Sequence, residues 1–438
     1  KRQYTLKHKY LFSVNARVDG SSRFGTNNKY GFFPSASAGW RISEEAFMEP
    51  VKEVISNLKL RASYGFTGNT EIGVYESLAT LGTSNWILGN QLVSGFFPNK
   101  IPNPDLKWER TGQFDIGLDL GLFNNRLRIT TDYYKKKTTD LLYSVAVPAT
   151  SGYQTMLKNI GSIENQGYEL SIESDNLTGA FSWTTAFNIA FNRNKVLELG
   201  GEEYKEMAEG DGHLKTGSVR RLIVGEPIGV FYGYRFDGIF QNEEECKQQT
   251  SSASPIGVGL RRYKDLNGDG KGDAANDREI LGDANPKFFG GLTNTFAYKG
   301  FELNVFLQYS YGNKILNYNA MELENPTGGQ NAYADMVNRW TPENPSNIYP
   351  KATTNRALLV SDRFIEDGSY LKLKTLSLSY SFPKINLKHI QGLRLYVTGQ
   401  NLLTWTKYRG YDPEVSYRGA STLEAVSYTH LRAHETSQ

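Results

Sequence analysis

Acidic and amide side chains recur at short intervals between residues 265 and 277, a spacing that suits a hard cation. Oxygen-bearing residues occupy positions 1, 3 and 5 of this run, and Gly270 at position 6 permits the sharp turn of a calcium loop. Position 12, normally a glutamate that binds through both oxygens, is Asn276. The candidate ligands are Asp265, Asn267, Asp269, Asp273 and Asp277. Two interpretations stay open: a weak or structural Ca²⁺ site, and a solvated loop that binds no ion.

The sequence contains no catalytic motif. It lacks GxSxG, HExxH, phosphate-binding-loop and paired-cysteine patterns. Its single cysteine, Cys246, excludes a disulfide within the chain. The five histidines have no metal-ligand spacing: they are His8, His213, His389, His430 and His434. The acidic pairs, such as Glu202 and Glu203, lie in polar stretches where solvation is the default. We therefore expect no enzyme activity, no catalytic residue and no required cofactor, with Ca²⁺ as the one optional ion.

Residues 113–134 alternate between apolar and polar side chains in the manner of a β-hairpin. In QFDIGLDLG (113–121) the apolar residues share one face and the acidic residues share the other. In RLRITTDYY (126–134) the apolar face comprises Leu127, Ile129 and Tyr133, and the polar face comprises Arg126, Arg128 and Asp132. The segment between them, LFNN, contains two Asn residues, which tolerate positive φ. We predict strands of about 9 to 11 residues, long enough to cross a bilayer when tilted.

The same alternation recurs along most of the chain. It is found in residues 167–173, 183–191, 301–311, 376–382 and 393–398. Counting such segments predicts about a dozen strands. Helical periodicity is weak, and the best candidate helix, SEEAFMEPVKEVI, would begin with Ser43 as its N-cap and be interrupted by Pro50.

The connections between these strands are of two kinds. Some are as short as two residues, as at Lys299-Gly300, whereas others run from Gln241 to Pro286 and from Asn313 to Gly368. A soluble β-sandwich also alternates, but its strands are shorter and its turns more evenly spaced. Long strands with short turns at one end and long loops at the other favour an all-β fold, an antiparallel transmembrane β-barrel with long extracellular loops.

The composition agrees with a barrel. The 438 residues include 27 Tyr and 23 Phe. No stretch of 18 or more apolar residues occurs, which excludes a transmembrane helix and hence an inner-membrane transporter. The net charge of +3 is nearly balanced and forms no basic stripe, so nucleic acid is not an expected partner.

Aromatic residues in the expected loops are candidates for stacking on sugars. Trp86, Tyr333 and Trp340 lie in such segments. Most Tyr and Trp residues of a membrane barrel, however, form the aromatic girdles at its two interfaces. We therefore assign no substrate-binding residue from the sequence.

Ten segments in order resemble the barrel of the SusC/RagA family of TonB-dependent outer-membrane transporters from the Bacteroidetes. They span residues 16 to 416 and are ARVDGSSRFG, FFPSASAGWRISEEAF, LKLRASYGFTGN, NPDLKWERTGQFDIGLDLGLFNNRL, DYYKKKTTDLL, NIGSIENQGYELSI, DLNGDGKGD, RWTPENP, FIEDGSYLKLKTLSLSYSFP and GQNLLTWTKYRGYDPEVS. Each segment alone is weak, and ten in the family's order are specific.

The resemblance implies energy-driven import. Family members have a barrel of 22 strands with a plug inside it, a SusD-like lipoprotein over the extracellular face, and the TonB–ExbB–ExbD system acting on the plug. The implied cargo is an oligosaccharide or, as an alternative, a peptide or metal chelate. The implied location is the cell outer membrane, with outer-membrane lipid around a multi-pass barrel. An alternative from another class is a passive pore or a surface adhesin.

The resemblance also predicts the organisation of the chain. Residues 1–425 would form the barrel region, without the plug and the first strands. Residues 426–438, VSYTHLRAHETSQ, lack sustained alternation and do not end on the aromatic residue that the resemblance implies, so we expect them to be a non-native tail.

Overall fold

A computed structural model describes residues 1–153, 155–207, 218–325, 331–354, 359–382 and 392–414. The chain forms two compact units. Unit 1 comprises Lys1–Glu203, Leu292–Leu303 and Tyr380–Arg394, and unit 2 comprises Tyr204–Gly291, Asn304–Ser379 and Leu395–Gln438. The expected tail at 426–438 and four of the five histidines lie outside the described residues.

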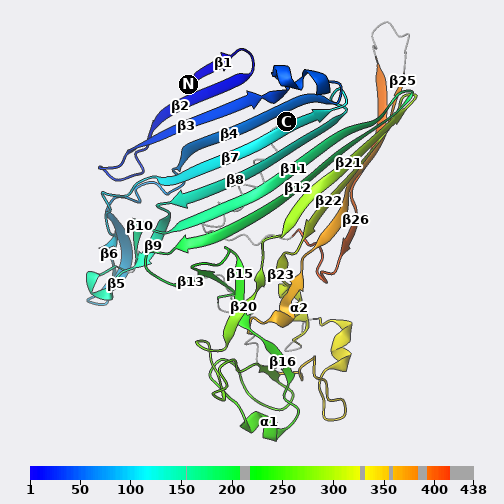
Figure 1. The fold of residues 1–438 in the computed structure, drawn as a ribbon. Helices are drawn as coiled ribbons and strands as arrows, with labels where there is room; N and C mark the ends of the chain where they lie inside the picture. Colours follow the sequence, from blue (N-terminus) through cyan, green and yellow to red (C-terminus); the bar gives the residue numbers. More distant parts are fainter. Residues whose placement is uncertain (154, 208–217, 326–330, 355–358, 383–391, 415–438) are drawn as a thin grey trace. The chain divides into compact units, whose positions relative to one another are not determined.

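The dominant element is a sheet of 12 strands, in the order β1-β2-β3-β4-β7-β8-β11-β12-β21-β22-β25-β26 (Figure 1). Its strands are β1 (Arg2–Leu6), β2 (Tyr10–Gly20), β3 (Tyr30–Arg41), β4 (Ile55–Asn69), β7 (Glu109–Leu122), β8 (Leu127–Thr139), β11 (Ser162–Thr178), β12 (Phe181–Glu198), β21 (Phe288–Tyr298), β22 (Phe301–Tyr311), β25 (Tyr370–Phe382) and β26 (Leu393–Thr406). The pairs from β1 to β12 are antiparallel. The prediction of about a dozen long strands is confirmed.

Several strands are longer than the 9 to 11 residues predicted for the hairpin. Strand β7 has 14 residues, β8 has 13, and β11 and β12 have 17 and 18. In β7, β8 and β12 most of the excess lies at the end where the long connections begin, whereas β11 extends at both ends.

One end of the sheet carries the tighter turns. These are residues 7–9, 42–54, 123–126, 179–180 and 299–300. The predicted hairpin turn is confirmed, since Phe123, Asn124 and Asn125 all have φ between 55° and 60°. The predicted N-cap at Ser43 is wrong: residues 42–54 form two 3-10 helices, η1 (Ile42–Glu44) and η2 (Ala46–Val51), and Ser43 is buried inside the first. The physical reason is Glu45, which breaks the helix in extended conformation while its carboxylate accepts hydrogen bonds from Lys9, Tyr10 and Trp40.

The other end carries long connections with their own structure. In residues 70–108 the elements are β5 (Thr80–Leu88) and β6 (Gln91–Lys100), and in residues 140–161 they are β9 (Leu142–Ala146), η3 (Ala149–Ser151) and β10 (Thr155–Asn159). Residues 199–287 contain β13 (Tyr204–Met207), β14 (Arg220–Ile223), β15 (Val230–Tyr234), β16 (Phe236–Ile239), α1 (Glu243–Lys247), β17 (Thr250–Ser251), β18 (Arg261–Tyr263), β19 (Lys271–Gly272) and β20 (Arg278–Asp283). Residues 312–369 contain β23 (Lys314–Leu316), α2 (Tyr318–Leu323), η4 (Ala334–Asn338), η5 (Asp362–Phe364) and β24 (Ile365–Asp367).

None of the helices in the described residues has both the length and the apolar character needed to cross a membrane.

Candidate transport surface

One face of the sheet in unit 1 is polar from strand to strand. The register aligns Ser13 with Ser37, Ser37 with Ser63, and Ser63 with Asp115. The Ser63 hydroxyl donates to the Asp115 carboxylate at 3.1 Å. Because residues two apart on a strand share a face, the next row toward the long connections is also polar and contains Asn15, Ser35 and Gln113. Small hydroxyls leave the face shallow and rich in groups that can bond to hydroxyl or amide ligands.

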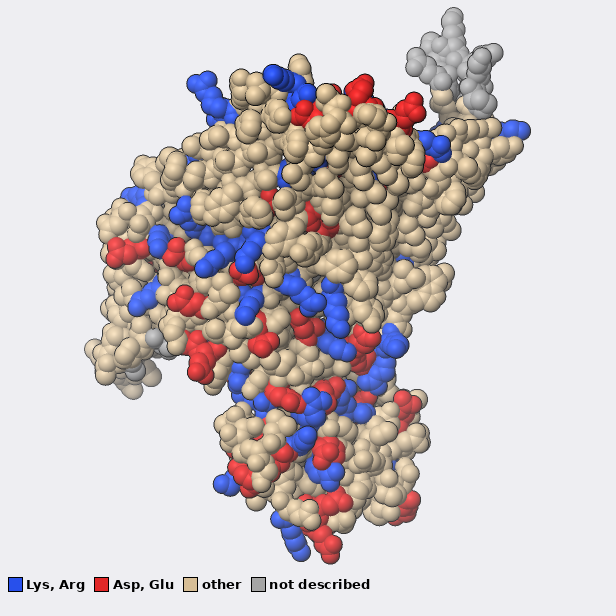
Figure 2. Space-filling view, in the orientation of Figure 1, with Lys and Arg blue, Asp and Glu red and all other residues tan. Residues whose placement is uncertain are grey.

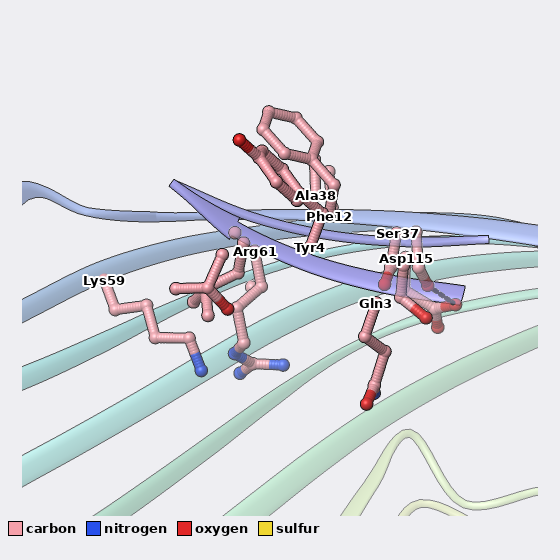
Figure 3. A pocket seen from close by; sticks show the side chains of 15 residues that line it. Gln3, Tyr4, Phe12, Ser37, Ala38, Lys59, Arg61 and Asp115 are labelled. Atoms are coloured by element: carbon pink, nitrogen blue, oxygen red, sulfur yellow. Dashed lines mark hydrogen bonds between the residues drawn. The ribbon is translucent and has the colours of Figure 1, made fainter. Parts of the chain in front are cut away.

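A hollow of about 430 Å³ opens on this region, at strands β1 to β4 and β7. In Figure 3 its lining side chains leave the strands in two directions: Lys59, Arg61 and Gln3 project from one side, and Tyr4 and Phe12 project from the other. Polar side chains therefore leave one side of the sheet at this hollow, and aromatic side chains leave the other side.

The most charged part of the polar face is centred on Arg61. Its guanidinium donates two hydrogen bonds of 2.9 Å to Asp119 and lies 3.0 Å from an oxygen of Asp132. A Cβ on Gly117 would lie 2.1 Å from the Asp132 carboxylate, so the absent side chain at that position makes room for the pair. Arg61 on β4 thereby binds carboxylates on β7 and β8, and these charge-assisted hydrogen bonds hold the three strands together at this point.

The opposite face is apolar, as the hairpin pattern predicted. The register aligns Leu120, Ile129, Ile172 and Phe187 in one row, and Ile116, Tyr133, Tyr168 and Phe191 in another. Leu127, Ile129 and Tyr133 lie on this face, whereas Arg128 and Asp132 lie on the polar face, so the predicted facing is confirmed for them. Arg126 lies in the turn outside β8, where it donates to the carbonyls of Asp175 and Asn176.

Three connections at one end of the sheet, residues 21–29, 70–108 and 140–161, meet at a small apolar core, which we call the loop collar. It consists of Phe24, Leu106 and Leu142, each less than 10% exposed, and Leu106 is fully buried. Hydrogen bonds surround it: Gly25 N donates to Leu106 O at 3.0 Å, and the buried Glu109 carboxylate accepts from Leu142 N at 2.9 Å. The segment NPDLKWE (103–109), which ends the connection from β4 to β7, therefore contacts both residues 21–29 and residues 140–161.

A hairpin projects beyond this collar and exposes an apolar surface. Strands β5 and β6 pair from Thr80 to Lys100. Trp86, Ile87 and Phe96 are each at least 60% exposed, and no charged residue occurs between Thr80 and Asn99. An uncharged, solvent-facing apolar surface of this kind typically marks a protein interaction site.

Unit 2 contains a buried ion cluster around Glu324, whose side chain is 1% exposed. Its carboxylate accepts from Arg363 at 2.6 Å and from Arg409 at 2.9 Å. Arg409 also bonds to Glu366, and it belongs to the segment that follows β26. The cluster thus fastens residues 407–414 to the long connection that contains α2, η5 and β24.

A second set of ion pairs holds the same segment to β25. Lys372, 1% exposed, donates to Asp412 at 3.0 Å and to Glu414 at 2.5 Å, and Lys374 donates to Glu414 at 2.8 Å. Burial alone would raise the pKa of Glu414, but the hydrogen bonds from Lys372 and Lys374 lower that pKa from 4.5 to about 2. Glu414 therefore stays ionised and paired over the physiological pH range.

The comparisons with known proteins agree with this geometry. A family model described as "TonB dependent receptor-like, beta-barrel" matches residues 2–402. TonB-dependent receptor P3 of Formosa agariphila is 42% identical over 98% of this chain and 44% of its own length. TonB-dependent receptor SusC of Bacteroides thetaiotaomicron is 32% identical over 94% of this chain and 40% of its own length. The solved RagAB peptide transporter has a TM-score of 0.78 and 29% identity, over 94% of this chain and 44% of that one.

The chain belongs to the TonB-dependent receptor β-barrel family. It spans less than half the length of these relatives. As a family member it is an outer-membrane protein, and the 12-stranded sheet is part of the wall of an antiparallel transmembrane barrel. The apolar face therefore contacts lipid and the polar face lines the lumen, with the tight turns in the periplasm and the long connections outside the cell.

In the predicted calcium loop of this receptor, the carboxylates accept hydrogen bonds from backbone N–H groups of the same loop. Asp265 accepts from the backbone N–H of Gly268 and Gly270, both at 2.7 Å. Asp277, 1% exposed, accepts from Leu266 N and Asp273 N. Within the described residues no group of three or more His, Cys, Asp or Glu side chains is placed to hold a metal ion. The Ca²⁺ site stays a prediction, and the loop has an internal hydrogen-bond network that can hold its shape.

The aromatic candidates fall into two groups. Tyr333 packs against the apolar core of unit 2, and Trp340 donates to Gln241 at 3.1 Å, so both have structural partners. Trp86 alone of the three is mainly exposed, on the β5–β6 hairpin. The loop collar and the Lys372 pairs were not predicted from the sequence. The polar, charge-rich motifs NPDLKWE and YDPE beside strand ends were the available signal.

Proposed function

We propose that the full-length protein imports a nutrient across the outer membrane, with an oligosaccharide as the first candidate cargo. The observation that carries the proposal is the likeness to SusC over 94% of this chain, together with a luminal face of Ser, Asn and Asp side chains. Such side chains donate and accept hydrogen bonds in the way that sugar hydroxyls require. The energy would come from the TonB–ExbB–ExbD system, as the family resemblance implies.

A peptide is the second candidate cargo. It is favoured by one observation, the likeness to the RagAB peptide transporter over 94% of this chain. Peptide amides use the same donors and acceptors as sugar hydroxyls, so the luminal face by itself suits both.

We further propose that a SusD-like lipoprotein binds the extracellular end of the barrel. The exposed apolar surface of the β5–β6 hairpin supports this proposal. Aromatic rings that become buried in a protein interface contribute strongly to the free energy of binding. The loop collar supports it as well, since it fixes the base of the hairpin.

Growth and uptake test the cargo. A strain that lacks the gene should lose growth on one oligosaccharide class, or on peptides, and should keep growth on the corresponding monomers. Uptake of that nutrient should also stop when the gene is intact and TonB is removed. Unchanged growth on every oligosaccharide and peptide would overturn the proposal, and uptake that continues without TonB would indicate a passive pore.

Co-purification tests the partner. Trp86→Ser with Phe96→Ser should reduce recovery of the lipoprotein with the full-length receptor. The matched control is Phe123→Ser, which removes a 54% exposed ring from a periplasmic turn and should leave recovery unchanged. Equal recovery for both variants would show that the hairpin does not bind the lipoprotein. The test of the cargo does not depend on that result.

A further inference from the structure

The lipid-facing side of unit 1 ends in a group of cations at its extracellular boundary. These cations form two rows across β8, β11 and β12. The upper row aligns Lys137 and Lys195 on either side of Glu164. The lower row aligns Lys135 and Arg193 on either side of Gln166. We call Lys135, Lys137, Arg193 and Lys195 the rim cations.

The rim cations point toward the lipid side and not into the lumen. They share strand parity with Tyr133 and Phe191, which lie on the apolar face, and all four are exposed. The residues that alternate with them, such as Asn194 and Val196, are buried on the luminal side. Each cation therefore projects from the outer wall of the barrel.

Their height on the wall follows from the register. Tyr133, Tyr168 and Phe191 form the last aromatic row, and the Tyr133 and Tyr168 rings lie 4.8 Å apart. Such aromatic rows mark the membrane interface. The two cation rows follow at two and four residues, which for strands tilted by about 40° places them roughly 5 and 10 Å farther out along the membrane normal. This is the depth of the lipid head groups.

The charge of the group is unbalanced. Glu164 is the one carboxylate among the side chains of the two rows, and it pairs with Lys135 at 3.1 Å. For the other three rim cations the described part of the chain contains no carboxylate within ion-pair distance. Figure 2 shows a largely uncharged surface over the strands, with Lys, Arg, Asp and Glu gathered near the strand ends and over the long connections.

We propose that the rim cations bind the phosphate groups of lipopolysaccharide in the outer leaflet. Lys and Arg are the side chains that recognise phosphate, and Arg193 can do so with two parallel hydrogen bonds. Neighbouring strands lie about 4.8 Å apart, so Lys135 and Arg193 are separated by roughly 10 Å and can contact phosphate from both sides. The acyl chains would then lie along the apolar rows below, over Ile129 and Ile172.

The test is lipopolysaccharide binding by the full-length protein in detergent, measured by native mass spectrometry. Lys135→Gln with Arg193→Gln should weaken binding at least about tenfold, because each cation near a charged membrane surface contributes about 1 kcal/mol. The matched control, Lys7→Gln with Lys299→Gln, removes the same charge from periplasmic turns and should bind as the unchanged protein does. A charge-keeping variant, Lys135→Arg with Arg193→Lys, should retain binding and shows that loss is not due to misfolding.

Two further probes identify what is recognised. Dephosphorylated lipopolysaccharide should bind the unchanged protein about as weakly as intact lipopolysaccharide binds the double Gln variant. Inorganic phosphate at matched ionic strength should not displace intact lipopolysaccharide. Equal binding of the double Gln variant and the control would overturn the proposal, as would undiminished binding of the dephosphorylated lipid or displacement by inorganic phosphate.

Discussion

Lys372 and Asp412 are joined by two hydrogen bonds, in which the buried ammonium donates to both carboxylate oxygens at 3.0 and 3.1 Å. Asp412 lies beyond the end of β26, whereas Lys372 lies within β25. A single buried cation therefore fixes the path of the chain after the last described strand. Glu414 binds the same ammonium, so one substitution removes both ion pairs that Lys372 makes with this segment.

Lys372→Met should loosen residues 412–414 from β25, whereas Arg409 stays paired with Glu324 and Glu366. The substitution keeps most of the side-chain volume and removes the charge, which leaves two carboxylates without their buried partner. We expect the local free energy of opening to fall by about 2 kcal/mol, because charge-assisted hydrogen bonds are lost while both carboxylates keep some access to water. Hydrogen exchange of the backbone amides in this segment measures the change. Lys374→Met removes a single, more exposed pair and should cost about 1 kcal/mol or less; equal effects of the two would contradict a special role for Lys372.

The attachment should also weaken in acid. The pKa of Glu414 is lowered from 4.5 to about 2, so its ionised form is bound more tightly in the folded state. Its contribution to stability is fully present above pH 4.5 and is lost as the pH falls through about 2. Cleavage by pepsin near Tyr411 should therefore increase over this range. In Glu414→Gln the cleavage should already be high at pH 4.5 and change little below it; a steep rise in that variant would assign the effect to another group.

Leu106→Ala should loosen the loop collar. Leu106 is fully buried among Phe24 and Leu142, and such a truncation costs about 2 to 5 kcal/mol where the site cannot collapse. The expected readout is faster tryptic cleavage at Lys100 and Lys107, at the base of the β5–β6 hairpin. Leu81→Ala is the control, since Leu81 is 69% exposed. If both variants resist trypsin as the unchanged protein does, the collar does not hold the hairpin.

The next prediction concerns the binding of Ca²⁺ to residues 265–277. If Asp265, Asn267 and Asp269 bind Ca²⁺, the ion should protect residues 265–277 from proteolysis, and a chelator should reverse the protection. Asp269→Ala should abolish the difference, whereas Glu243→Gln, which removes a carboxylate of α1 outside the run, should preserve it. Protection that is the same with and without Ca²⁺ would leave the backbone hydrogen bonds of Asp265 and Asp277 as the loop's stabilising contacts.

The barrel wall was predictable from the sequence because its signal is local. A period of two residues is visible within each strand, so the facing of Ile129 and Asp132 followed from one hairpin. The turn at 123–126 was predictable for the same reason, since Asn tolerates the positive φ that the turn requires.

The loop contacts were not predictable, because they join residues far apart in the chain. Leu106 packs against Phe24 and Leu142, and Arg409 reaches Glu324 across 85 positions. No periodicity links such residues. The short helix predicted at Ser43 was wrong for a related reason. Glu45 accepts hydrogen bonds from Lys9 and Tyr10, which lie more than 30 positions earlier in the chain.

Ile129→Arg and Thr130→Arg test the two faces of the wall with adjacent residues. Ile129 aligns with Leu120 and Ile172 on the lipid side, where an arginine near the bilayer midplane costs about 2 to 4 kcal/mol. Thr130 aligns with Asp119 on the luminal side, where an arginine meets water and a carboxylate. We therefore expect the first variant to lower the amount of receptor assembled in the outer membrane and the second to leave it near the level of Ile129→Leu. Quantitative immunoblotting of outer-membrane fractions measures both, and a larger loss for Thr130→Arg would reverse the assignment of lipid and lumen.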